Sequence, residues 1–145
     1  MALFVIMVLY AVIGSLAAAG SVFIVKKLFS AKGEQIFFAL FLIAIAGFYL
    51  AFTAYFGAKE AWRFETAGVV AFGVLGLLAT RLRAVLIIGY LVHGLWDVLH
   101  EIHAHGGTDL FGVQHVTEIP LAYGAFCAAF DLWVAAYFYT RTGDF

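Results

Sequence analysis

The sequence predicts an all-α integral membrane protein, a bundle of five transmembrane helices that forms a single domain over residues 1–145. Two features of the composition favour this class. Hydrophobic residues make up 66% of the chain and charged residues 12%, and the mean hydropathy is +1.05. Soluble domains are about half apolar and about a quarter charged. The third observation is the arrangement, because apolar stretches of about 20 residues, the length that crosses a bilayer, alternate with short polar segments.

The first predicted span covers residues 2–25 and is followed by Lys26 and Lys27. No basic segment precedes its apolar run, so we expect a retained helix rather than a cleaved signal peptide. Its middle, residues 14–21, consists mainly of Gly, Ala and Ser, which let helices approach closely. We expect this span to be scaffold or to contact another subunit, in a homo-oligomer or a larger membrane complex.

The second predicted span covers residues 36–57 and follows a polar loop at residues 30–35. It carries Tyr49 and Thr53 one helical turn apart. Two interpretations stay open for this pair. The two side chains line a polar cavity, or Thr53 bonds only the backbone of its own helix, as Thr often does in membrane spans.

The third predicted span, residues 61–80, is the shortest in apolar length, and Glu65 lies in its first turns. A carboxylate in the first turn of a helix is favoured by the helix dipole. We therefore interpret Glu65 as a first-turn acid that pairs with Arg63 or Lys59, rather than as a ligand.

The last two predicted spans cover residues 84–104 and 120–139. Pro120 is expected in the first turn of the final helix, a position that proline favours. Cys127 and Asp131 lie inside that helix. Cys127 is the single cysteine of the chain, so the sequence predicts no internal disulfide.

Basic residues set the expected orientation. With five spans, two basic residues fall on one side, and six fall on the other: Lys26, Lys27, Lys32, Arg81, Arg83 and Arg141. Since the cytoplasmic side carries the excess of Lys and Arg, we expect a cytoplasmic C-terminus and an exported N-terminus. The net charge of −1 gives no indication of a nucleic-acid partner, and the expected partner is the lipid bilayer.

Residues 93–105, HGLWDVLHEIHAH, hold four of the five histidines. His93, Asp97 and His100 fall within roughly a 60° arc of one helix face. No Lys or Arg occurs from residue 84 to residue 140, although this part of the chain contains five acids: Asp97, Glu101, Asp109, Glu118 and Asp131. Any of these acids that is buried must be protonated, pair with a charged histidine, bind a cation or be reached by water.

Helical rise brings the last two spans together. His93 lies about 17 Å from the end of its span near Ala104, and Asp131 lies about 17 Å from Pro120. Consecutive antiparallel helices with a short connection pack as neighbours, so His93 and Asp131 are expected to meet near the middle of the membrane. Asp97 is then level with Cys127. The result is a polar column that opens towards the extracytoplasmic side.

We predict a metal site in this column. The expected ligands of a zinc, iron or copper ion are His93, Asp97, His100 and Asp131, since imidazole and carboxylate suit these metals. Asp131 or Glu101 is the candidate fourth ligand or general base. The expected lining of the pocket is Trp96, Tyr123 and Cys127. Whether the protein is an enzyme stays open; as an enzyme it would be metal-dependent and would act on a membrane-soluble substrate.

Three other interpretations of the cluster remain. Alternating Asp, His and Glu side chains suit a proton or cation relay in a transporter or membrane complex, because each group exchanges protons near neutral pH. A single axial histidine such as His93 suits haem or chlorin. In the third interpretation, the whole set of buried polar residues is structural and the protein is an accessory subunit.

Two motifs carry a resemblance to a known family. His93-x-x-Trp96-Asp97-x-x-His100, followed by the segment from Gly124 to Asp131, resembles a family of small bacterial integral membrane proteins of unknown function. The similarity covers roughly residues 90–137, the last two spans. It implies that the Trp-Asp-x-x-His motif and the Cys/Asp pair form one site in a multi-pass protein of the bacterial inner membrane. It implies no activity and no cofactor.

Overall fold

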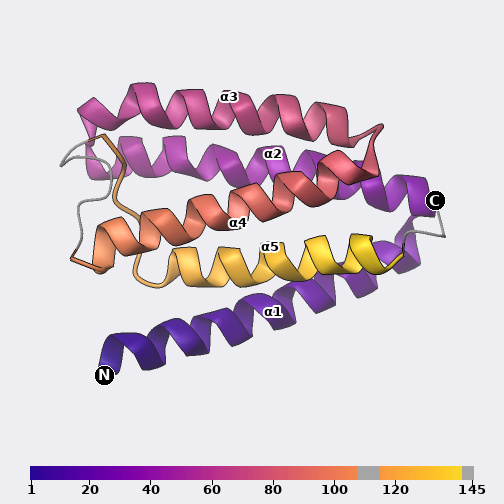
Figure 1. Ribbon diagram of the computed structural model, residues 1–145, viewed down its shortest axis with the longest axis horizontal. Coiled ribbons are helices and arrows are strands. Elements are labelled where there is room, and N and C mark those ends of the chain that lie inside the picture. The colour runs from indigo at the N-terminus through magenta and orange to yellow at the C-terminus, as the bar shows by residue number, and fades with distance from the viewer. Residues whose placement is uncertain (108–114, 142–145) are drawn as a thin grey trace.

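The computed structural model describes residues 1–107 and 115–141, and these residues form helices and connections without a strand (Figure 1). The predicted all-α class is confirmed. Asp109, which follows the fourth predicted span, lies outside the described residues. The elements in chain order are α1 (Ala2–Leu28), α2 (Ala31–Phe56), the 3-10 turn η1 (Lys59–Ala61), α3 (Trp62–Ala79), α4 (Arg83–His105) and α5 (Tyr123–Thr140).

Four of the helical segments are long and apolar enough to cross a membrane: α1, α2, the η1–α3 segment and α4. The segment that was shortest in apolar length, Lys59–Ala79, therefore qualifies. Helix α5 is outside this group because Asp131 and several tyrosines interrupt its apolar residues. Its 18 residues still extend about 27 Å, close to the thickness of the hydrocarbon core.

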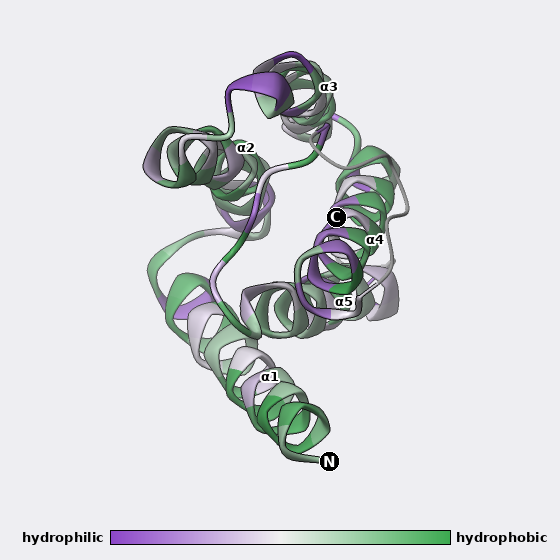
Figure 2. Ribbon diagram, turned by 90° about the vertical axis from the view of Figure 1, so that its left-hand side faces the viewer, coloured by the Kyte–Doolittle hydropathy of each residue, from purple (hydrophilic) through white to green (hydrophobic). Residues whose placement is uncertain are grey.

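Helix α5 lies between α4 and α1 (Figure 1), and these are its two most extensive contacts. The expected pairing of the last two helices is confirmed. Helix α3 packs on α2 and α4. Viewed along the helices, α1 and α2 diverge at the end of the bundle nearer the viewer (Figure 2).

Two glycines allow the close approach of α5 to its neighbours. A Cβ at Gly14 would collide with the Phe126 carbonyl, and a Cβ at Gly124 would collide with the Asp97 carbonyl. Gly14 and Ala18, from the small-residue stretch of α1, are buried in the chain. These residues therefore serve the scaffold role that the sequence suggested. Contact with another subunit stays a prediction.

Helix α2 begins at Ala31 rather than near residue 36, so residues 31–35 are its first turns and not a polar loop. The Ser30 hydroxyl accepts a hydrogen bond from the Gly33 N–H at 3.3 Å and caps the helix. The Gln35 side chain donates to the Ala79 carbonyl at 2.6 Å. The polar residues 30–35, which were predicted to form a loop, therefore cap α2 and contact α3.

Helix α5 begins at Tyr123, so the expected first-turn position of Pro120 is wrong. Ala122, just before the helix, has a φ of +61°. Its backbone N–H and that of Gly124 donate to the two oxygens of the Glu101 carboxylate, at 3.0 and 2.8 Å. A carboxylate from α4 therefore determines where α5 starts.

Polar bonds join three helix ends at one end of the bundle. The Lys32 amine donates to the Thr80 carbonyl at 2.7 Å. The Arg83 guanidinium donates to the Arg141 carbonyl at 3.1 Å, and the Arg141 guanidinium pairs with Glu34 at 2.9 Å. The start of α2, the α3–α4 turn and the end of α5 therefore meet, as alternating helix directions require.

Candidate functional site

Three fully buried ionisable residues converge in the middle of the bundle. One potential ligand atom each from His93, Asp97 and Asp131 lies within 4.8 Å of the other two. His93 Nδ1 lies 2.7 Å from Asp131 Oδ2 and 3.2 Å from Asp97 Oδ2. Helix α4 supplies two of these side chains one turn apart, and α5 supplies the third. The predicted meeting of His93 with Asp131 is confirmed.

Tyr49 brings α2 to this cluster. Its hydroxyl donates a hydrogen bond to Asp97 Oδ1, the oxygen of that carboxylate that does not face His93. Thr53 bonds the Tyr49 carbonyl at 2.7 Å. Each of the two interpretations therefore holds for one residue of the pair. Tyr49 faces the polar cluster, and Thr53 bonds the backbone of its own helix.

The cluster has fewer proton donors than acceptors. His93 Nε2, Asp97 Oδ2 and Asp131 Oδ1 are buried and have no hydrogen-bond partner. The rings of Phe72 and Tyr49 pack on His93, with centroids 4.8 and 6.1 Å away. With a neutral imidazole and two ionised carboxylates, the cluster would carry a net charge of about −2 in apolar surroundings, which is costly without protons or a cation.

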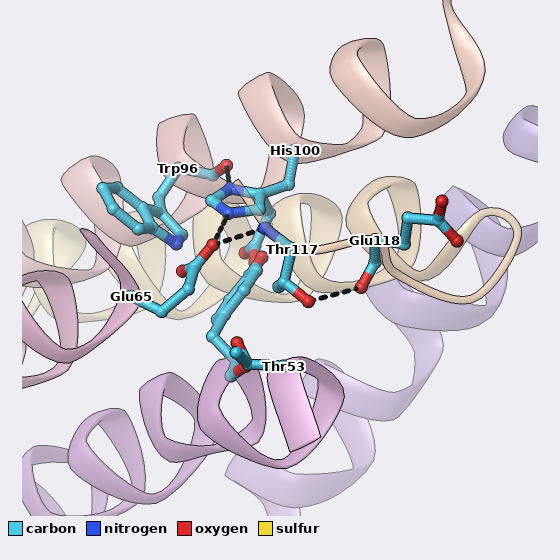
Figure 3. Close-up of polar contacts among 8 residues, drawn as sticks. Thr53, Glu65, Trp96, His100, Thr117 and Glu118 are labelled. Carbon is cyan, nitrogen blue, oxygen red and sulfur yellow. Dashed lines mark hydrogen bonds and ion pairs between the residues drawn. The ribbon is translucent and has the colours of Figure 1, made fainter. Parts of the chain in front are cut away.

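His100 lies in a second buried cluster, with Glu65 of α3. His100 Nε2 is 3.0 Å from Glu65 Oε1, and the same oxygen accepts the Thr117 N–H at 2.8 Å. Figure 3 shows the Glu65 carboxylate between the His100 ring and the Thr117 backbone. His100 was predicted to ligate a metal with His93 and Asp97, but it is not part of the three-residue group around His93.

The bonds of the His100 ring restrict its protonation. His100 Nδ1 is 2.9 Å from the Trp96 carbonyl, which can only accept, so Nδ1 carries a hydrogen. Nε2 then either donates to an ionised Glu65 or accepts from a protonated one. Both arrangements are electrically neutral, so the pair formed by His100 and Glu65 is balanced within itself.

Glu101, the candidate base or fourth ligand, is fully engaged elsewhere. Both of its oxygens accept backbone N–H groups that precede and begin α5. His105 Nδ1 lies 3.0 Å from the same carboxylate. These contacts support α5, and they hold the Glu101 carboxylate away from the group formed by His93, Asp97 and Asp131.

The three expected lining residues differ in their surroundings. Trp96 stacks on Phe64 with ring centroids 5.1 Å apart, in the apolar packing between α3 and α4. Cys127 is a buried free thiol on α5. Tyr123 contacts Phe52, with ring centroids 4.8 Å apart. None of the three is among the cluster's hydrogen-bonding groups in the described part of the chain.

The role of Glu65 escaped sequence reasoning. Its position in the first turn of α3 is confirmed, but its side chain bonds His100 and Thr117 rather than Arg63 or Lys59. A usable signal existed, because Glu65 lies about 6 Å inside its span and His100 about the same depth inside the adjacent span. The depth comparison that paired His93 with Asp131 would also have paired these two.

Comparison with known families gives one match. The profile of DUF6010, a family of unknown function, matches residues 9–144. The chain belongs to this family. Membership agrees with the expectation of an uncharacterised family, while the shared motif around Trp96 stays a prediction. No curated protein and no solved structure matches the chain.

Proposed function

We propose that this protein is a multi-pass membrane protein that binds one divalent transition metal, zinc, iron or copper, inside its helical bundle. The ligands are His93, Asp97 and Asp131. The observation that carries the proposal is the convergence of one imidazole and two carboxylates, all fully buried, within 4.8 Å.

Charge supports a cation at this position. A neutral His93 with two ionised aspartates has a net charge of about −2, which a divalent ion cancels. No Lys or Arg lies in the sequence from residue 84 to residue 140 to do the same. Ligand atoms around a metal with bonds of about 2.0–2.2 Å lie about 3.3 Å apart, so the cluster needs only small shifts.

The surroundings of the ligands resemble those of reactive metal sites. The Tyr49 hydroxyl bonds the Asp97 carboxylate, and such outer partners orient ligands and tune the metal. Three protein ligands leave one position of a tetrahedral ion for water or substrate. A metal there would supply Lewis-acid activation of water or of a carbonyl group, and the substrate would be membrane-soluble.

Elemental analysis of detergent-purified protein tests the proposal. We expect about one metal ion per chain after expression with zinc, iron and copper supplied, because three converging ligands form one site. The variant Asp131→Asn should lose the ion. The variant Glu65→Gln, which changes a buried acid of the second cluster, should keep it.

Two outcomes would overturn the proposal: wild-type protein that contains no stoichiometric metal, or equal retention by folded Asp131→Asn and wild-type protein. Retention by folded His100→Asn is expected. Loss of the metal from folded His100→Asn would instead show that His100 is a ligand, as the sequence suggested. Size-exclusion chromatography confirms that each variant is folded and monodisperse.

A proton relay is the second candidate, favoured by the position of Tyr49. Its hydroxyl bonds Asp97, and its ring centroid lies 4.4 Å from that of His100. Exchangeable groups thus extend from Asp131 through His93, Asp97 and Tyr49 towards His100 and Glu65. Metal-free protein that conducts protons in liposomes, and loses this flux in Asp97→Asn, would support the relay in place of the metal.

The proposal includes five crossings of a bacterial inner membrane, with the N-terminus exported and the C-terminus cytoplasmic. The six-to-two distribution of basic residues supports this orientation. The burial of Asp131 and Phe138 between neighbouring helices supports a membrane position for α5. Cysteine labelling from either side of the membrane, at residues 58 and 81, tests the orientation.

A further inference from the structure

A pocket of about 400 Å³ lies at the end of the bundle where α2 and α4 end, and we call it the polar pocket for the charged residues in its lining. The residues that line it come from the end of α2, the α2–α3 turn, the last turns of α4 and the segment before α5: Phe56, Gly57, Ala58, Lys59, Glu60, His103, Val116 and Glu118. Within the part of the chain that the structure describes, the charged groups of Lys59, Glu60 and Glu118 make no hydrogen bond or ion pair. This pocket is separate from both buried histidine clusters.

An apolar groove of about 620 Å³ runs along the outside of α2 next to the polar pocket. Its lining is almost entirely apolar: Phe48, Ala51, Phe52, Tyr55, Phe56 and Pro120. Phe56 belongs to both sites, so the polar pocket and the apolar groove adjoin at that residue. Each volume is within the range of small-molecule sites, about 300–1,000 Å³.

The orientation of the two sites matches an amphiphile in a bilayer. The groove faces outward from α2, a helix apolar enough to cross a membrane, and the pocket lies beyond the end of that helix. A ligand that filled both would place its chain along α2 and its polar group at the α2–α3 turn. Aromatic side chains such as Tyr55 are common at this boundary of a membrane.

Charges at the turn indicate the kind of polar group. Lys59 offers one ammonium, and Glu60 and Glu118 offer two carboxylates. A head group that carries both a phosphate and a primary ammonium would pair with all three. A primary ammonium also donates hydrogen bonds to carboxylates, which a quaternary one does not.

We propose that the polar pocket and the apolar groove together bind one phospholipid with an ethanolamine head group. The phosphate lies at Lys59, the ammonium lies at Glu60 and Glu118, and an acyl chain occupies the groove along α2. This site is independent of the proposed metal. It requires neither His93 nor an ion, so either proposal can fail without the other.

Native mass spectrometry of the full chain in detergent, titrated with synthetic lipids of identical acyl chains, tests the site. We expect one phosphatidylethanolamine to bind about tenfold more tightly than phosphatidylcholine or phosphatidylglycerol, a difference that two charge-assisted contacts can supply. The variant Ala51→Trp fills the groove and should weaken binding by about tenfold. The matched control is Ala54→Trp, which adds the same side chain to an exposed position of α2 outside the groove.

A second variant separates the head group from the chain. Glu60→Gln combined with Glu118→Gln should remove the preference for phosphatidylethanolamine while one lipid still binds. The proposal is overturned if the three lipids bind alike to wild-type protein, or if Ala51→Trp and Ala54→Trp behave alike. Either result would mean that only general bilayer lipid surrounds α2.

Discussion

Helix α4 carries two buried histidines two turns apart, and they differ in how their charge is balanced. His100 pairs with one acid, Glu65, and both of its ring nitrogens are bonded. His93 faces two acids, Asp97 and Asp131, and its Nε2 has no partner. The first pair has one acid for one imidazole, although Glu65 Oε2 is also buried without a hydrogen-bond partner. The second cluster has two acids for one imidazole, so it is the one whose charge an added proton or a metal ion would balance.

The comparison teaches that a dense run of histidines on one helix is not one site. A step of four residues from His93 to Asp97 and a step of three from Asp97 to His100 place all three side chains on one face of α4. The neighbouring helices then divide them. Helix α5 meets His93, and α3 meets His100. Function must be argued from the partners that each histidine finds.

The largest effect is expected from breaking the balanced pair. Glu65→Leu leaves His100 buried without its acid and should lower the free energy of unfolding by about 3 kcal/mol, the scale for removing one member of a buried pair. The double variant Glu65→Leu with His100→Phe should recover a large part of that loss. Unfolding in mixed micelles with SDS measures both. A double variant as unstable as the sum of the two single ones would show that the residues are not coupled.

A bound metal should stabilise only a protein with an intact His93 cluster. At a metal concentration about 100 times Kd, linkage predicts about 2.7 kcal/mol of added stability for wild type. Chelation should remove this gain. Asp131→Asn should show no gain, whereas Glu65→Gln should keep it. Thermal unfolding with and without metal makes the measurement, and a gain of equal size in Asp131→Asn would contradict the ligand assignment.

Glu101 is a buried acid that belongs to neither histidine cluster, so its removal should affect stability but not metal binding. Glu101→Ala removes the acceptor of two buried N–H groups and should cost about 2 kcal/mol of stability without loss of metal. The same change at the exposed Glu118 should cost less than about 0.5 kcal/mol. Unfolding and elemental analysis of the two variants together check this. Metal loss in folded Glu101→Ala would show that Glu101 takes part in metal binding.

Tyr49 gives the smallest expected effect. Tyr49→Phe deletes one buried hydrogen bond to Asp97 and should cost about 1 kcal/mol of stability. As an outer partner of a ligand it should also weaken metal binding by about tenfold. Tyr55→Phe, at a side chain that is 83% exposed, is the control and should change neither quantity. A tenfold loss in the control would mean that the measurement reports general destabilisation.

Composition and helical rise predicted the larger features of the molecule. The helix count and the pairing of α4 with α5 follow from apolar lengths and short connections, and the contact of His93 with Asp131 follows from equal depth. Helix starts were less predictable. The start of α5 depends on Glu101, which lies more than 20 residues earlier, and the first turn of α2 uses Gln35 in a contact with the end of α3. Such contacts require the tertiary structure.

The candidate site was predicted only in part, because it too depends on contacts between helices. The positions of His93, Asp97 and His100 on one face of α4 are a property of a single helix, and sequence periodicity gives it. Which neighbour each side chain meets depends on how α3 and α5 are rotated around α4. The bond between Glu65 and His100 joins residues 35 apart in the chain. A first-turn acid looks the same in sequence whether it faces a basic neighbour or a buried imidazole.

The modest hydropathy of α5 has a consequence for how the protein is assembled. In the proposed five-span arrangement, the bilayer resists a helix that holds Asp131 when this helix enters alone. Helices α1 and α4 are synthesised before α5, and they provide the surfaces on which α5 packs. His93 of α4 is then already present to receive the Asp131 carboxylate. In that arrangement we expect α5 to integrate stably as the His93 cluster is completed, and a chain without His93 would lose one of the contacts that hold its last helix.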